Sequence, residues 1–172
     1  LIPFRQRLAE NTVRYLLQRS YPTPYLQQLG IIDQDAQCQD MVERFVRICP
    51  HIRVFTQQPD AYQPFLQKIM EEYGPSIILT QELSGLQSCN LILCPQDFSW
   101  QKPVHLTAPV ICAGSCQISG STPVVHDLVP QLDESFLEQV PQGILPIQFA
   151  AAFHHLLPES FLDSCRAASG VC

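Results

Sequence analysis

Short apolar runs alternate with helix-patterned segments along most of this chain. Continuous apolar runs of this length are typical of strands that are covered on both faces of a sheet. We therefore expect strands over residues 29–33, 52–56, 77–79, 90–94, 109–113 and 123–127, and an edge segment over residues 143–147.

Between these runs, apolar residues recur at helical spacing. Residues 4–20 predict an amphipathic N-terminal helix, and residues 38–46 predict a second one. The third helix is capped by Asp60 and ends at the stop signal Gly74-Pro75. A helix-rich tail is expected from about Gln148 to the end.

Alternation of strands and helices predicts an α/β fold. The expected architecture is a Rossmann-like, doubly wound and mostly parallel sheet with helices on both faces. The chain has 172 residues, which suits one domain. We expect residues 1–28 to be a helical segment packed on the core and residues 29–172 to be the Rossmann-like domain.

Three segments carry a family resemblance. They are Arg53–Thr56, which leads into a helix, Cys89–Cys94, and Val124–Pro130, which contains Asp-Leu-Val. Their order resembles the NAD(P)-binding domain of the shikimate dehydrogenase and glutamyl-tRNA reductase type, over about residues 29–157. The resemblance implies an NAD(P)-dependent oxidoreductase, or one domain of such an enzyme.

The two landmarks of dinucleotide binding are missing. The turn after the first strand, residues 33–37, contains no glycine, whereas a bound pyrophosphate needs close approach to backbone N–H groups. Asp33, Asp35 and Asp40 crowd this turn and would repel a phosphate. After the second strand, Thr56-Gln57 replaces the acid that contacts ribose. Conventional NAD(P) binding is therefore disfavoured, although the cofactor question stays open.

In open parallel sheets, ligands bind beyond the carboxyl ends of the strands, near the point where the strand order switches. The Gly114–Ser121 segment, read as a loop, offers small residues and free backbone N–H groups there. The residues expected to contact a cofactor or ligand are Asp33, Gln34, Thr56, Gln57, Cys94, Pro95, Gly114 and Ser115. No catalytic residue is identified.

The chain contains eight cysteines, most of them inside apolar patterns. Such thiols usually pack as small hydrophobic groups, and we expect them to be reduced in a cytoplasmic protein. Asp33, Cys94, Cys112, Cys116, His126 and Asp127 all fall at the expected ligand-binding edge. This set suggests a zinc-type metal site or a redox pair, but packing is the stronger interpretation, so no metal site is assigned.

Other polar groups give weaker signals. His154 and His155 are adjacent on an expected helix over residues 150–157, so they point about 100° apart and cannot easily share a metal. Asp133-Glu134 and Glu71-Glu72 are expected to be solvated. The serines near Gly114 lack the Gly-x-Ser-x-Gly pattern of a hydrolase.

Composition narrows the function classes. The net charge is −6 and the ten basic residues are scattered, which argues against a nucleic-acid partner. Apolar runs are too short for a membrane span. Small-molecule ligand, protein partner and homo-oligomerisation remain open. The leading hypothesis is a diverged, non-catalytic ligand-binding or interaction module. The alternatives are an oxidoreductase with atypical NAD(P) binding, and a metal or thiol-redox protein.

Overall fold

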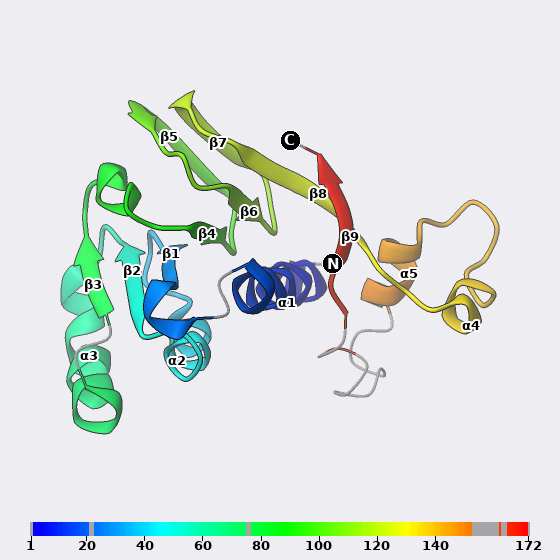
Figure 1. Ribbon diagram of the computed structural model, residues 1–172. Coiled ribbons are helices and arrows are strands. Elements are labelled where there is room, and N and C mark those ends of the chain that lie inside the picture. Colours follow the sequence, from blue (N-terminus) through cyan, green and yellow to red (C-terminus); the bar gives the residue numbers. More distant parts are fainter. Residues whose placement is uncertain (1, 21–22, 75–76, 153–161, 163–164, 172) are drawn as a thin grey trace.

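A doubly wound sheet organises the molecule (Figure 1). The computed structural model describes residues 2–20, 23–74, 77–152, 162 and 165–171. Seven strands lie in the order β3-β2-β1-β4-β6-β8-β9. Their bounds are β1 Gln28–Ile32, β2 His51–Phe55, β3 Ile77–Thr80, β4 Leu91–Cys94, β6 Val110–Cys112, β8 Val124–Pro130 and β9 Ala167–Val171.

The strand order confirms the predicted α/β class. The chain enters at β1, winds outward to β3, returns to β4 beside β1, and then winds outward in the other direction. Strands β1 to β8 of this sheet pair in parallel, and β9 adds an antiparallel edge. Ile31 pairs with Val54 in β2 and with Leu93 in β4, so buried aliphatic side chains form adjacent rungs of the core.

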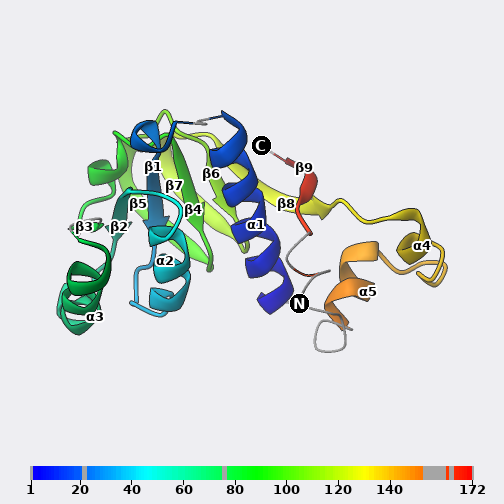
Figure 2. The same ribbon diagram turned by 60° about the horizontal axis from the view of Figure 1, so that its bottom comes forward.

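Three helices cover one face of the sheet (Figure 2). They are α1 Ile2–Ser20, α2 Gln39–Val46 and α3 Pro59–Tyr73. Their apolar stripes, which include Leu8, Phe45 and Tyr62, join the sheet in one buried cluster. Figure 1 shows α1 running beneath the middle of the sheet, and α1 lies against β4, β6 and β8. This placement brings the first turns of α1 close to the strand ends.

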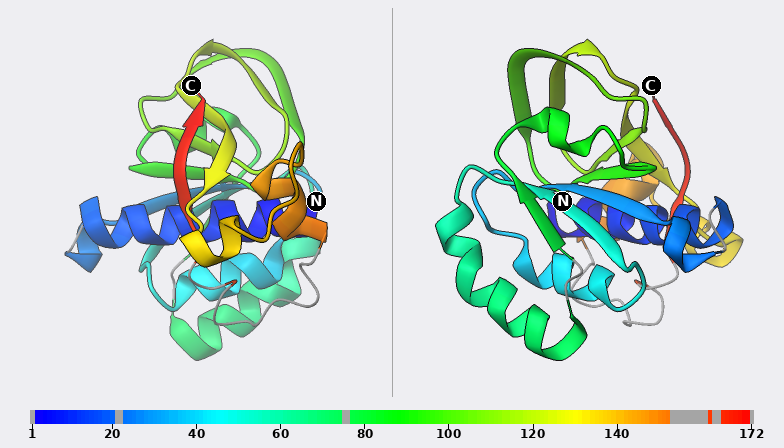
Figure 3. Two further views of the ribbon diagram at one scale, coloured as in Figure 1. Left: turned by 90° about the vertical axis from the view of Figure 1, so that its right-hand side faces the viewer. Right: turned by 60° about the vertical axis from the view of Figure 1, so that its left-hand side comes forward.

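Strands provide most of the cover on the opposite face (Figure 3). The chain leaves β4 for β5 Phe98–His105 and leaves β6 for β7 Cys116–Ser121, and β5 pairs with β7 in parallel. The only helical cover found there among the described residues is a 3-10 turn, η2 Leu83–Leu86. Each of these strands occupies the position of a crossover helix. Aromatic rings tie the two layers together: Phe55 of β2 meets Phe98 and Trp100 edge-on, with centroids 5.6 and 5.2 Å apart.

Short elements complete the described chain. A 3-10 turn, η1 Pro24–Leu26, precedes β1, and α4 Glu134–Leu137 and α5 Pro146–Ala152 follow β8. Phe136 of α4 and Ala150 of α5 pack with Phe4 of α1 in a small separate cluster. The N-terminal helix therefore contributes to two buried clusters. The division of the chain at residue 28 stays a prediction.

Two sequence predictions are wrong in detail. No edge strand forms over residues 143–147, because Gly143 adopts a left-handed φ of 86° and Pro146 begins α5. The Gly114–Ser121 segment is not a loop, because residues 116–121 form β7 and pair with β5. The described part of the predicted helix-rich tail contains α5 and also a strand, β9, on the edge of β8.

Two smaller points concern helices. Gln58, rather than Asp60, is the N-cap residue of α3, and Asp60 lies in its first turn. The predicted helix over residues 150–157, with His154 and His155, lies largely outside the described residues. In the part of the chain that the structure describes, no helix is long and apolar enough to cross a membrane.

Candidate functional site

The point where the strand order switches lies between β1 and β4. A cavity of about 490 Å³ opens there, beyond the carboxyl ends of both strands. We call it the switch-point cavity. Polar groups dominate its lining, which comprises Ile32, Gln34, Asp35, Cys94, Gln96, Asp97, Phe98, Ser99, Ser115 and Gln117. The fold therefore places a cavity where open α/β sheets bind their ligands.

Asp33 lies in the turn between β1 and α2, the part of a Rossmann-type fold that contacts a dinucleotide phosphate. Its buried carboxylate accepts hydrogen bonds from the backbone N–H groups of Gln37 (2.8 Å) and Cys38 (2.9 Å), just before α2. The hydroxyl of Tyr62 donates a third bond to it. Two N–H groups that precede the helix therefore already bond to an acidic side chain.

The turn after Asp33 reaches its shape without glycine. Ala36 takes a left-handed φ of 56° instead. The carbonyl oxygen of Gln34 accepts bonds from the Gln57 N–H (2.9 Å) and the Thr56 hydroxyl (3.3 Å), which tie the β1–α2 turn to the β2–α3 turn. Both turns are thus fixed by bonds within the chain.

The residues after β2, where dinucleotide-binding proteins carry the acid that contacts ribose, are also hydrogen-bonded within the chain. Thr56 is fully buried, and its hydroxyl oxygen accepts a bond from the Gln58 N–H (3.1 Å). The side-chain amide of Gln57 donates to the carbonyl oxygen of Gln81 (2.9 Å). Neither Thr56 nor Gln57 lines the switch-point cavity.

Of the eight residues predicted to contact a ligand, five line a cavity and three are hydrogen-bonded within the chain. Gln34, Cys94 and Ser115 line the switch-point cavity, while Pro95 and Gly114 line a neighbouring cavity of about 370 Å³ beside α1. Asp33, Thr56 and Gln57 bond to the chain itself. Ligand contact by any of the eight stays a prediction.

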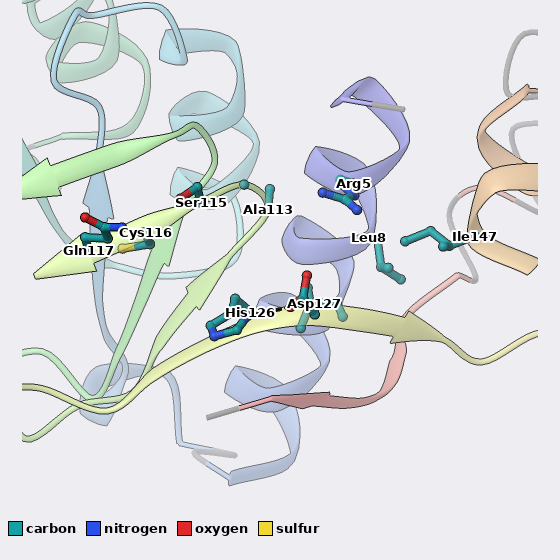
Figure 4. A pocket seen from close by; sticks show the side chains of 11 residues that line it. Arg5, Leu8, Ala113, Ser115, Cys116, Gln117, His126, Asp127 and Ile147 are labelled. Atoms are coloured by element: carbon teal, nitrogen blue, oxygen red, sulfur yellow. Dashed lines mark hydrogen bonds and ion pairs between the residues drawn. The ribbon is translucent and has the colours of Figure 1, made fainter. Parts of the chain in front are cut away.

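A further cavity of about 440 Å³ lies between α1, the β6–β7 turn and β8; we call it the helix-side cavity (Figure 4). Arg5 and Leu8 of α1 form one wall, and Cys116 and His126 lie on the strand side. Nδ1 of His126 lies 2.8 Å from a carboxylate oxygen of Asp127, which has a left-handed φ of 50°. Ser115 and Gln117 line both this cavity and the switch-point cavity.

Three cysteines meet between the two cavities. Cys94 ends β4, Cys112 ends β6 as its register partner, and Cys116 begins β7. Their sulfur atoms all lie within 4.8 Å of one another. Cys94 and Cys112 are buried, whereas Cys116 is partly exposed. We call these residues the thiol trio.

The three thiols differ in acidity. Hydrogen bonding to Cys112 and Cys94 lowers the pKa of Cys116, and attraction by His126 lowers it further, against the effect of burial. Hydrogen bonding to Cys112 and Cys116, with burial, raises the pKa of Cys94. Hydrogen bonding to Cys116, with burial, raises the pKa of Cys112. The cluster therefore favours one thiolate, on the sulfur nearest solvent.

Several contributors to these cavities were not predicted. Arg5 is the clearest case. Its position next to Phe4 and about one turn before Leu8 in the predicted helix was the available signal that it lies near the core. Gln96, Asp97 and Ser99 were missed because β5 was not predicted. Of the weaker candidates, Asp133 is the N-cap residue of α4, and Glu71 and Glu72 are exposed on α3.

Comparison with known proteins gives no relative. No protein-family model matches the chain, and no curated protein matches it significantly. The resemblance to the shikimate dehydrogenase and glutamyl-tRNA reductase type therefore has no homologue behind it. The strand order is compatible with a Rossmann-like fold, and the functional argument depends on the geometry described above.

Proposed function

We propose that this protein is a ligand-binding module that takes a small polar molecule without a phosphate group in the switch-point cavity. The observation that carries the proposal is the lining of this cavity. Two carboxylates, from Asp35 and Asp97, lie among amides and hydroxyls, and no lysine or arginine is found among the described lining residues. Such groups accept hydrogen bonds from hydroxyl or amino groups.

Electrostatics disfavour a dinucleotide at the same place. A phosphate about 4 Å from one carboxylate is repelled by about 1 kcal/mol in bulk water and by about 4 kcal/mol near a protein surface. The N–H groups of Gln37 and Cys38, which precede α2, already donate to Asp33 and so offer no attraction to a phosphate. The alternative of an NAD(P)-dependent oxidoreductase therefore ranks second.

A thermal-shift series separates these functions. The full chain is heated with NAD(H), NADP(H), inorganic phosphate, glucose or glucosamine at millimolar concentration. A ligand present at 100 times its Kd adds about 2.7 kcal/mol of stability. We expect a rise in Tm with a sugar or amino sugar and none with the phosphate compounds. A clear rise with NAD(H) or NADP(H) would overturn the proposal.

Two glutamine variants locate the binding. Gln34→Ala removes a side chain from the cavity lining, and Gln57→Ala removes one that lies outside it. We expect only Gln34→Ala to weaken sugar binding, measured as a smaller shift in Tm. Equal weakening by Gln57→Ala would instead place the ligand along the conventional ribose position.

A further inference from the structure

The thiol trio is organised before any ligand arrives. The N–H of Ala113 donates to the carbonyl oxygen of Cys94 (2.9 Å), and the N–H of Phe98 donates to that of Ser115 (2.8 Å). These bonds hold the β6–β7 turn against the β4–β5 connection on both sides. Cys116 is thereby held close to Cys112, although the two belong to different strands.

Asp97 and Gly114 lock the same turn. A carboxylate oxygen of Asp97 accepts a bond from the Ser115 N–H (2.7 Å). A Cβ atom at Gly114 would lie 2.3 Å from that oxygen, so glycine is required for this close approach. The backbone that carries the three cysteines is thus held by hydrogen bonds between the two connections and from the Asp97 side chain.

The sulfur atoms have the spacing that a metal ion needs. A metal–sulfur bond of about 2.3 Å requires sulfurs about 4 Å apart around a three-coordinate centre. The trio lies within 4.8 Å, so a small contraction is enough. In the part of the chain that the structure describes, no other group of three or more His, Cys, Asp or Glu side chains reaches this spacing. Cys38, Cys49, Cys89 and Cys165 are buried thiols outside it.

We propose that Cys94, Cys112 and Cys116 bind one Cu(I) ion through their three sulfur atoms. Thiolates are soft ligands, which select Cu(I) over harder cations. Zn²⁺ is also thiophilic, but its closed structural sites take four protein ligands, whereas the trio supplies three. Binding forms three copper–sulfur bonds, releases the thiol protons to solvent and leaves the oxidation state of copper unchanged.

The location of the trio suits a small ion. Cys116 lines the helix-side cavity (Figure 4), and Cys94 lines the switch-point cavity. An ion can therefore reach the sulfur atoms from solvent. The apolar cluster around Cys94 and Cys112, which includes Ile92 and Val110, limits access of water to the bound metal. This inference is independent of the polar ligand proposed above.

The test is an anaerobic titration of the reduced full chain with Cu(I) against the chelator bathocuproine disulfonate. We expect one tightly held Cu(I) per chain, and X-ray absorption of the complex should show sulfur neighbours only. Less than one ion per chain, nitrogen or oxygen neighbours, or tight binding of Zn²⁺ without Cu(I) would overturn the proposal.

Cysteine variants assign the site. Cys116→Ser changes a partly exposed thiol and should fold normally, as circular dichroism would show. We expect it to weaken Cu(I) binding by more than about 100-fold. Even residues that only hydrogen-bond to a metal ligand contribute about 10–100-fold to metal affinity, and loss of a ligand itself should cost more. Cys49→Ala removes a buried thiol outside the trio and should leave binding unchanged. An equal loss of Cu(I) affinity in both variants would refute the assignment. Should Cys116→Ser not fold, the X-ray absorption data on the unaltered chain decide whether sulfur atoms bind the ion.

Discussion

Asp33 lies at the carboxyl end of β1, where its buried carboxylate accepts bonds from Gln37, Cys38 and Tyr62. Asp33→Asn exchanges one acceptor oxygen for an NH₂ group, which leaves at least one buried donor without a partner. We expect a loss of about 1–3 kcal/mol in the free energy of unfolding, measured by urea denaturation. Asp35→Asn, at an exposed neighbour, is the matched control and should change stability little. Equal losses in both variants would contradict this role of Asp33.

Ala36 adopts a left-handed φ of 56°, a conformation that costs a residue with a Cβ atom about 1–2 kcal/mol. Ala36→Gly removes this cost but adds freedom to the unfolded chain worth about 0.5–1 kcal/mol. We therefore expect a net gain of roughly 0.5–1 kcal/mol, seen as a higher midpoint in urea. Ala61→Gly, in the first helical turns of α3, should instead lower stability. A loss at both positions would show that the turn is not strained.

Burial makes two cysteines unreactive. It raises the pKa of Cys38 and of Cys89 to about 12, so both thiols stay protonated at pH 8 to 9. Since the thiolate is the reactive form, iodoacetamide should leave both unmodified in the native protein and modify them in urea. Mass spectrometry of digested protein measures this directly. Rapid modification of Cys89 without urea would mean that the β5–β7 side of the core opens.

The β5–β7 pair depends on a close approach at Gly120. This residue has a φ of 113°, and a Cβ atom there would lie 2.1 Å from the carbonyl oxygen of Val104. Gly120→Ala should cost at least about 1–3 kcal/mol from backbone strain, with the steric clash in addition. Gly143→Ala places an alanine at another position with a positive φ, but with open space around it, and should cost less. Denaturation curves of the two variants compare the clash directly, and equal losses would exclude it.

The six parallel strands and three large helices were predictable because their apolar patterns are unambiguous. The β5–β7 pair was not. Its strands are half exposed, and polar residues, a proline and Gly120 interrupt them, so residues 116–121 resembled a loop. These strands are stabilised by pairing with each other over the sheet, which is a tertiary effect.

The candidate site shows the same division between local and tertiary information. The absence of a glycine-rich turn after Asp33 was visible in the sequence. That its carboxylate would bond to the N–H groups before α2 was not, because this depends on the path of the turn. Likewise, the predicted strand ends placed Cys94, Cys112 and Cys116 at one edge of the sheet. The close approach of their sulfur atoms depends on β7, which was not predicted.

At the scale of the whole molecule, an ion pair connects the buried Glu10 of α1 to the partly exposed Arg44 of α2. Glu10 is almost fully buried, and its two carboxylate oxygens each lie 2.8 Å from Arg44. Arg14 adds a third bond at 3.1 Å. Removing the arginine is costly because the buried carboxylate of Glu10 is left with fewer hydrogen-bond donors.

Arg44→Ala should therefore lower the free energy of unfolding by about 1–3 kcal/mol, because the buried Glu10 carboxylate loses two hydrogen bonds and keeps the one from Arg14. Chemical denaturation, with the transition followed by two optical probes, measures this loss. Glu43→Ala, which removes a surface partner of Lys68 and Arg47, should have little effect. A small effect at both positions would mean that α1 is held by its apolar contacts alone.

The internal bonds of Asp33 bear on how the protein matures. The N–H groups of Gln37 and Cys38, which precede α2, receive their acceptor from a side chain of the same polypeptide. The turn between β1 and α2 therefore completes these hydrogen bonds as the chain folds, with no bound molecule needed to supply them.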